Sequence, residues 1–377
     1  MATISRYTHR CLSWPQGSAD RQLEYLLHLG MRYRLDGWAL FPTTDEAAAL
    51  LARHHAVLGE WFKITTPPWE VMRWAYDKRL TYGLAGQLGV DYPWTHYPRS
   101  REELAAVDCA FPVILKPAIK RGVNRLTDAK AWRVDNRQEL LARYDEACTL
   151  VDPDVIMVQE LIPGGGDHQF SFAALCADGR PLASMVARRV RQHPMDFGRF
   201  STYVETIDEP VVEEVARRLL ATMCFTGLVE VEFKRDPRTG RPKLLDINAR
   251  TWAWHTLGRR AGIDFPYLLW RLLQGQQVPE THAPPGVRWV RMVTDFPAAC
   301  SAIRCGSLSW SAYFRSLRGP LEFATLAKDD PLPAILELPV LMYRSWERRA
   351  LLRTASREDT TGEGGTMGQA MTPNIQP

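Results

Sequence analysis

Two short segments, G-L-V-E-V-E-F at Gly227–Phe233 and L-L-D-I-N-A-R at Leu244–Arg250, decide the fold of this chain. Polar and apolar residues alternate in the first, and both are typical of β-strands. Between them lies D-P-R-T-G-R at Asp236–Arg241, whose proline and glycine favour a chain reversal. The sequence therefore predicts a β-hairpin.

The predicted hairpin would gather oxygen ligands on one face. Glu232 and Asp246 can lie on the same face of the sheet, and Asn248 follows two residues further along it. Two carboxylates and an amide oxygen suit Mg²⁺, which fills its remaining positions with phosphate oxygens and water. Arg250 would lie just beyond the ion, where its guanidinium can hold phosphate or a developing oxyanion. The alternative is an ordinary hairpin with two solvated carboxylates.

A strand upstream, F-P-V-I-L-K-P at Phe111–Pro117, is apolar except for Lys116. Burying an ammonium group is costly unless an anion meets it, so a nucleotide phosphate is a natural partner. A solvated charge at a strand edge is the alternative.

The segment V-I-M-V-Q-E-L-I-P-G, Val155–Gly164, predicts a strand that carries Glu160 and then breaks at a proline and glycines. The backbone groups freed at that break can read an adenine edge, while Leu161 and Ile162 supply apolar contact. The residues that follow, placed to reach a ribose hydroxyl or the metal shell, are Asp167 and His168.

The order of these segments resembles that of ATP-grasp ligases over roughly residues 69–275. W-E-V-M-R-W-A-Y-D-K at Trp69–Lys78 is similar to the helix that opens the ATP-grasp region and carries its first nucleotide-binding lysine, here Lys78. G-V-D-Y-P-W-T at Gly89–Thr95 resembles a turn of the family. The strand with the second lysine, the adenine-binding hinge and the paired metal strands follow in the family's order. One departure is Asp246, which stands where many relatives carry glutamate.

The resemblance implies an α/β protein with the α+β ATP-grasp fold. A shortened Rossmann-like piece is expected first, then a core of two subdomains, then a mostly helical extension and a disordered tail. The expected boundaries are 1–68, 69–278, 279–353 and 354–377. Within the core, the small subdomain is expected at about residues 91–161, with a cationic lid loop at Ala118–Arg125.

The beginning of the chain departs from the family pattern. Thr3–Cys11 reads as the middle of a Rossmann-like domain, and no glycine-rich turn or opening strand precedes it. A helix near 19–29, a strand near 37–41 and a helix near 45–55 are expected to follow. A lost βαβ unit, a late start and a partner that covers the gap all remain open. Because a sheet that lacks its first strand exposes an unpaired edge, this region is expected to be the least stable.

Arg188, Arg189 and Arg191 form the densest cationic cluster and lie between the hinge and the metal strands. We expect contact with triphosphate or with an acidic substrate, and we assign Arg191 a catalytic role beside Arg250. A solvated strand face is the alternative.

The resemblance also implies an activity. ATP and Mg²⁺ would activate a small-molecule carboxylate as an acylphosphate, and a small-molecule amine would capture it to form an amide. Lys78, Lys116 and Arg250 would offset the developing charge, and Glu230 is a candidate for a general base. An enzyme that activates bicarbonate and a non-catalytic ATP-binding protein are the alternatives.

Composition agrees with a cytoplasmic enzyme. The chain has 377 residues and a formal net charge of only +4, with no basic block interleaved with aromatic residues, so nucleic-acid binding is not expected. Seven cysteines without a C-x-x-C motif fit reduced thiols. The sequence predicts no membrane span, and a homo-oligomer is a possible assembly.

Overall fold

The computed structural model describes residues 2–119, 122, 124–193, 200–343 and 346. The chain divides into two compact units: Ser13–Ala324, and Met1–Leu12 with Thr325–Pro377. The expected disordered tail lies outside the described residues, as do residues 120, 121 and 123 of the expected lid loop. No helix in the described parts of the chain is long and apolar enough to cross a membrane.

The larger unit begins with a small α/β layer. Its elements are α1 (Ala19–Tyr33), β1 (Ala39–Leu40), α2 (Asp45–Arg53), α3 (His55–Gly59) and β2 (Lys63–Ile64). Ser18 and Thr44 cap α1 and α2 because their hydroxyls accept backbone N–H groups of the first turn. β1 and β2 pair in parallel as a sheet of their own. The two helices and the strand expected from the sequence are confirmed, with boundaries within a few residues.

A second sheet has four strands in the order β3-β6-β4-β5, all paired antiparallel. Its strands are β3 (Thr95–His96), β4 (Val113–Pro117), β5 (Trp132–Val134) and β6 (Ile156–Glu160). The helices beside it are α6 (Arg101–Ala106), α7 (Arg125–Ala129) and α8 (Arg137–Cys148). Val113 and Leu115 of β4 are buried in one core with Leu104 of α6 and Leu140 of α8. The strand alternation therefore turns Lys116 to the opposite face.

A third sheet has eight strands in the order β11-β10-β7-β8-β9-β13-β14, with β12 also paired to β8. Its strands are β7 (Gln169–Ala177), β8 (Arg180–His193), β9 (Phe200–Thr206), β10 (Gly227–Arg235), β11 (Pro242–Asn248), β12 (Thr281–His282), β13 (Arg288–Val290) and β14 (Leu321–Phe323). The region expected to be a mostly helical extension thus also contributes strands to this sheet. The region also contains the helices α12 (Met292–Arg304) and α13 (Trp310–Ser316) and a further helix over 332–343.

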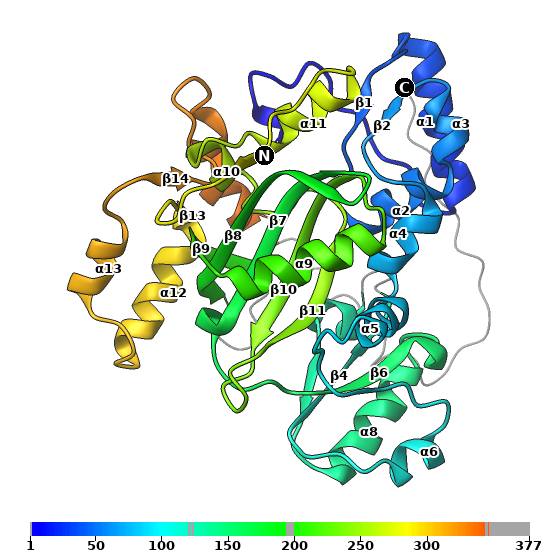
Figure 1. Cartoon of the computed structure of the whole chain (residues 1–377), viewed down its shortest axis with the longest axis vertical. Coiled ribbons are helices and arrows are strands. Elements are labelled where there is room, and N and C mark those ends of the chain that lie inside the picture. Colours follow the sequence, from blue (N-terminus) through cyan, green and yellow to red (C-terminus); the bar gives the residue numbers. More distant parts are fainter. Residues whose placement is uncertain (1, 120–121, 123, 194–199, 344–345, 347–377) are drawn as a thin grey trace, which may run out of the picture. The chain divides into compact units, whose positions relative to one another are not determined.

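The two faces of the large sheet bury separate cores. α9 (Pro210–Thr222) lies across one face (Figure 1), where it shares a core with α4 (Trp69–Tyr76), α5 (Lys78–Gln87) and the side chains of Val229, Val231 and Phe233. α10 (Thr256–Arg260) and α11 (Phe265–Leu273) contribute to the core of the other face, which includes Leu228. Because Glu230 and Glu232 share the alternation of Leu228, their side chains belong to this second face.

The α/β layer meets the large sheet at the start of β10. Gly227 has φ of +117°, and a Cβ atom there would lie 2.7 Å from the backbone oxygen of Thr65. Both the left-handed conformation and this close approach require glycine. The first residue of the decisive hairpin is therefore fixed against the N-terminal layer.

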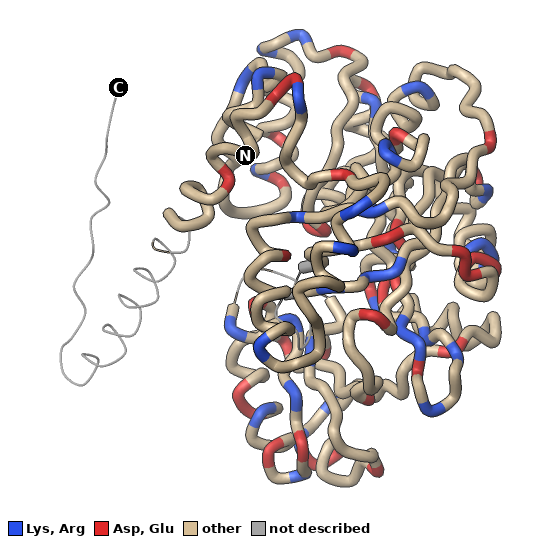
Figure 2. The backbone as a smooth tube through the Cα atoms, turned by 90° about the vertical axis from the view of Figure 1, so that its left-hand side faces the viewer, with Lys and Arg blue, Asp and Glu red and all other residues tan. Residues whose placement is uncertain are grey.

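The smaller unit has few elements in its described part. It contains the short 3₁₀ turn Ala2–Ile4 and a helix over 332–343. The Ser5 hydroxyl donates to Asp330 at 2.5 Å, and the Tyr7 hydroxyl donates to Asp329 at 2.5 Å. Basic and acidic residues are interspersed along the described backbone rather than gathered in one block (Figure 2).

We expect backbone amides of β1 and β2 to exchange with solvent earlier than those of β7 and β10. β1 and β2 pair over only two residues each, whereas β10 is paired along both edges, by β7 and β11. Local opening of the short pair therefore breaks far fewer contacts. Hydrogen exchange followed by peptide mass spectrometry measures this order, and equal protection of the two regions would contradict it.

Candidate functional site

The hairpin brings the expected oxygen ligands together. In the register of β10 and β11, Glu232 pairs with Asp246 and Glu230 pairs with Asn248, so all four share one face. The Asn248 amide donates from Nδ2 to Glu232 Oε1 at 2.7 Å and to Glu230 Oε2 at 3.1 Å. The expected placement of Glu232, Asp246 and Asn248 on one face is confirmed.

Negative charge is concentrated at this face. Glu230 is 3% exposed, and its burial, together with the neighbouring carboxylate of Glu232, raises its pKa to about 8. Arg189 and a hydrogen bond of 3.0 Å from the Ser171 hydroxyl offset part of this effect. A buried carboxyl group and a partly buried carboxylate that repel each other in this way favour a bound cation.

The side chains that could hold Mg²⁺ include an amide as well as carboxylates. Among the residues that the structure describes, no three His, Cys, Asp or Glu side chains are arranged to hold a metal ion by themselves. The set that fits is therefore Glu232 and Asp246 with the Asn248 amide, completed by phosphate oxygens and water as Mg²⁺ commonly requires.

Lys78 is held against the hairpin from the first residue of α5. Its Nζ atom donates to Asp246 Oδ1 at 2.6 Å. Burial acts to lower the Lys78 pKa, but Asp246 and the more distant carboxylates outweigh burial, and the pKa is raised. Burial likewise acts to raise the Asp246 pKa, but Lys78 outweighs it, and that pKa is lowered. The pair is therefore charged, with a cation already beside one expected metal ligand.

Lys116 faces the same cluster from the small sheet. It is half-buried, and burial, together with the positive charge of Lys78, lowers its pKa to about 7. Asp246 and Glu232 act on this pKa in the opposite direction, so the carboxylates of the large sheet lie within electrostatic range of Lys116. No hydrogen-bond or ion-pair partner for its ammonium occurs among the described residues. A half-buried lysine without a partner favours an anionic ligand.

Arg250 lies beside Asn248 and contacts a residue that the sequence did not indicate. Its Nη2 atom donates to Asn248 Oδ1 at 3.3 Å, and its Nε atom donates to Asp45 Oδ1 at 2.6 Å. Asp45 follows the helix cap Thr44 in the sequence, which explains an acidic residue there without indicating a site. Nothing local in the sequence distinguishes Asp45 from any other first-turn carboxylate.

The arginine cluster of β8 is divided by a bulge. Arg189 donates to Glu232 Oε2 at 3.5 Å, whereas Arg191 forms a two-bond ion pair with Asp295 of α12, with both distances 2.8 Å. Arg189 and Arg191 would share a face in a regular strand, but the register shifts between them, and Arg191 pairs with Tyr203. The structure thus places Arg191 outside the carboxylate cluster and brings Arg189 to it.

The side chain of Glu160 is engaged by the hairpin turn. It accepts from the Trp94 backbone N–H at 2.9 Å, from Arg238 at 2.7 Å and from the Lys243 ammonium. Burial acts to raise the Glu160 pKa, but Lys243 and the other donors outweigh it, and the pKa is lowered. Because these donors occupy its carboxylate, Glu160 joins the hinge to the hairpin in this structure instead of presenting a free carboxylate to a nucleotide.

The remaining hinge residues lie near the end of β10. Lys234 donates to the backbone oxygens of Ile162 and Gly164, both at 2.8 Å. The Leu161 N–H donates to the Pro112 oxygen at 3.4 Å. Asp167 and His168 form a short 3₁₀ turn, with His168 Nε2 4.0 Å from Asp167 Oδ2. Adenine and ribose contacts of these residues stay predictions.

Nucleotide binding at alkaline pH is expected to take up a proton at Lys116. With a pKa of about 7, Lys116 is largely neutral at pH 8, and a phosphate would restore the charged form. At pH 6 the ammonium is already charged, so this uptake should vanish. Calorimetric titration with a non-hydrolysable ATP analogue, in two buffers of different ionisation enthalpy, measures the proton count. An equal number of protons taken up at both pH values would contradict the assignment of Lys116 to phosphate binding.

Part of the chain matches a known protein family. A family model described as "ATP-grasp in the biosynthetic pathway with Ter operon" matches residues 152–295, which contain the hinge, the hairpin and all strands of the large sheet except β14. Residues 152–295 are therefore similar to the ATP-grasp family.

The chain is also distantly similar to two amino-acid ligases. It is 25% identical to the D-aspartate ligase of Enterococcus faecium over 240 residues, which are 56% of this chain and 53% of that protein. The chain thus matches about half the length of that relative. The fold is that of the L-amino acid ligase of Bacillus licheniformis, with a TM-score of 0.54, 17% identity, and coverage of 71% of this chain and 63% of the other.

The same fold occurs in an enzyme of different chemistry. Biotin carboxylase of Campylobacter jejuni, solved with an ATP analogue, aligns with a TM-score of 0.56 and 17% identity, over 68% of this chain and 58% of that one. The fold by itself therefore does not separate carboxylate–amine ligases from carboxylases.

Proposed function

We propose that this protein is an ATP-dependent carboxylate–amine ligase that forms an acylphosphate. The observation that carries the proposal is that Lys116, from the small sheet, lies within electrostatic range of Asp246, Glu232 and Lys78, the last of which bonds Asp246 at 2.6 Å. A partnerless cation opposite a carboxylate cluster is the arrangement that a triphosphate with a divalent cation requires.

The reaction would proceed in two steps. A substrate carboxylate oxygen attacks the γ-phosphorus of ATP, the bond to the β-phosphate oxygen breaks, and ADP leaves. The amine nitrogen then attacks the acyl carbon of the acylphosphate, inorganic phosphate leaves, and the nitrogen loses its proton. Bound at Glu232, Asp246 and Asn248, Mg²⁺ would neutralise phosphate charge during the transfer. Lys78 and Lys116 would bind phosphate oxygens, and Arg250 would face the developing negative charge.

The relative named D-aspartate ligase supports an amide-forming reaction, because its similarity extends over more than half of this chain. The acidic face of the hairpin supports a catalytic site, because the pKa of buried Glu230 is strongly raised by burial and by neighbouring Glu232, and such shifts are typical of functional sites. Both alternatives, activation of bicarbonate and nucleotide binding without turnover, remain distinguishable by experiment.

The experiment is a screen of carboxylate and amine pools for ADP and phosphate formation, with product mass spectrometry. A ligase should need both substrates and should form a hydroxamate when hydroxylamine replaces the amine. Turnover that depends on bicarbonate alone would favour the carboxylase-like alternative. Binding of an ATP analogue without turnover in any pool would indicate a non-catalytic protein.

A further inference from the structure

Asp45 lies outside every ATP-grasp segment of the chain, yet it contacts the site. Its carboxylate accepts from Arg250 Nε at 2.6 Å and from Nη2 at 3.5 Å, although 205 residues separate the two in sequence. The side chains are 35% and 21% exposed, respectively. Burial acts to lower the Arg250 pKa, but Asp45 outweighs this effect together with Glu230 and Asp246, and the pKa is raised.

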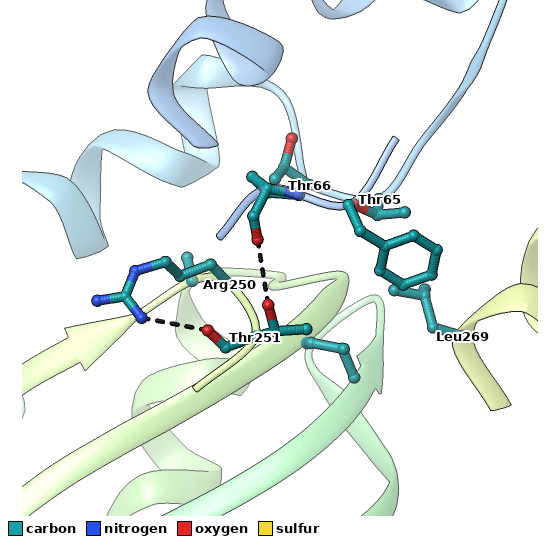
Figure 3. Close-up of a pocket in the computed structure, with 9 residues that line it drawn as sticks. Thr65, Thr66, Arg250, Thr251 and Leu269 are labelled. Carbon is teal, nitrogen blue, oxygen red and sulfur yellow. Dashed lines mark hydrogen bonds between the residues drawn. The ribbon is translucent and has the colours of Figure 1, made fainter. Parts of the chain in front are cut away.

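The contacts of Arg250 fix the plane of its guanidinium. Besides Asp45, they are the Asn248 amide oxygen and the Thr251 backbone oxygen, the latter at 3.2 Å from Nη1. Figure 3 shows the guanidinium extending away from Thr65 and Leu269, so the small cavity near them is not where it points. Of the three acceptors, Asp45 is the charged one, and charge-assisted bonds are the strongest.

Asp45 is itself held independently of the hairpin. It is the first residue of α2, whose cap Thr44 accepts from the Ala47 N–H at 3.2 Å. Ala48 and Ala52 of α2 are buried in the same core as residues of α4, and Arg53 lies 3.5 Å from the ring centroid of Trp69 at the start of α4. The helix therefore presents a fixed carboxylate to the end of β11.

We propose that Asp45 is a positioning residue that orients Arg250, so that the N-terminal layer completes the ligase site. The proposal rests on the proposed function for what Arg250 binds. Without Asp45 the long arginine side chain keeps two neutral acceptors among the residues that the structure describes, and its guanidinium loses a fixed direction. A displacement of this kind is costly to a reaction that depends on prepositioned charge.

The first test needs no substrate. Arg250 modification by phenylglyoxal, followed by peptide mass spectrometry, reports how firmly the guanidinium is held. We expect Asp45→Asn to speed modification about fivefold or more, because a charge-assisted bond is lost. The matched control is Glu46→Gln, which removes the same charge from the next, exposed residue of the same helix turn, and it should leave the rate unchanged. An unchanged rate in Asp45→Asn would overturn the proposal.

The second test is kinetic. With a carboxylate and amine pair that supports turnover, Asp45→Asn should lower kcat about 10- to 100-fold with little change in KM for ATP, and Asp45→Glu should restore part of it. Because Asp45 acts through Arg250, Asp45→Asn combined with Arg250→Gln should be no slower than Arg250→Gln alone. If the double variant instead showed the losses in kcat of both single variants multiplied together, the proposal would be overturned. Absence of turnover in the unmodified protein would refute the ligase function, while the modification rates would still decide the role of Asp45.

Discussion

Glu232→Gln is expected to reduce ATP-dependent phosphate release by about 100-fold or more while the protein stays folded. The substitution keeps the shape of the side chain and removes one negative charge from the pair formed with Asp246 across the hairpin. Mg²⁺ needs anionic charge as well as oxygen atoms. Asp246→Asn should act in the same direction, and it also deprives Lys78 of its 2.6 Å ion-pair partner.

A matched control for this prediction exists on the same sheet. Glu205 of β9 pairs with Arg188, the neighbour of Arg189, and Glu205→Gln removes an equivalent charge outside the cluster. Circular dichroism and thermal unfolding should show all three variants folded. If Glu232→Gln and Asp246→Asn both turn over like Glu205→Gln, the metal site lies elsewhere.

Lys116→Met is expected to stabilise the protein while it weakens nucleotide binding. Methionine fills similar space without a charged group to desolvate, so we expect a gain of about 1–3 kcal/mol in the free energy of unfolding. Affinity for a non-hydrolysable ATP analogue should fall about 10- to 100-fold, because a bond between a cation and phosphate is lost. A change of opposite sign in stability and in affinity is typical of a functional residue.

The stability gain should depend on pH. Burial lowers the pKa of Lys116 in the folded protein to about 7, from the ordinary lysine value of 10.5. Between these two pH values the unfolded chain therefore binds more protons than the folded one. The stability of the unsubstituted protein consequently rises with pH over this range. The advantage of Lys116→Met is therefore largest at and below pH 7 and disappears towards pH 10.5. Denaturant unfolding at pH 6.5 and pH 9.5 measures this difference.

Lys243→Met supplies the contrasting control. Lys243 is partly buried like Lys116, but it bonds Glu160 and lies 3.2 Å from Asp236, so its loss should destabilise the protein by removing one of the two cations that these carboxylates share with Arg238. If Lys116→Met destabilises the protein as Lys243→Met does, Lys116 has a structural partner and the proposed phosphate contact is wrong.

The sequence by itself determined the hairpin and the order of the segments around it. Alternation along Glu230–Phe233 and a turn rich in proline and glycine are local properties, and they were enough to place Glu232, Asp246 and Asn248 on one face. Lys116 was likewise identified from the sequence, because it is the single charged residue of an otherwise apolar strand. Such features can be predicted from the sequence, because the alternation of side chains along a strand depends only on residues that are adjacent in the sequence.

Only the tertiary structure decided which other side chains reach this face. A bulge in β8 turned Arg191 towards Asp295 and left Arg189 at Glu232, and no composition rule predicts where such a bulge occurs. Glu160 accepts hydrogen bonds from cationic side chains of the hairpin. Asp45 accepts one from Arg250, although 205 residues separate them in the sequence. These contacts depend on how separate layers pack, and packing of distant segments leaves no periodic trace in the sequence of either one.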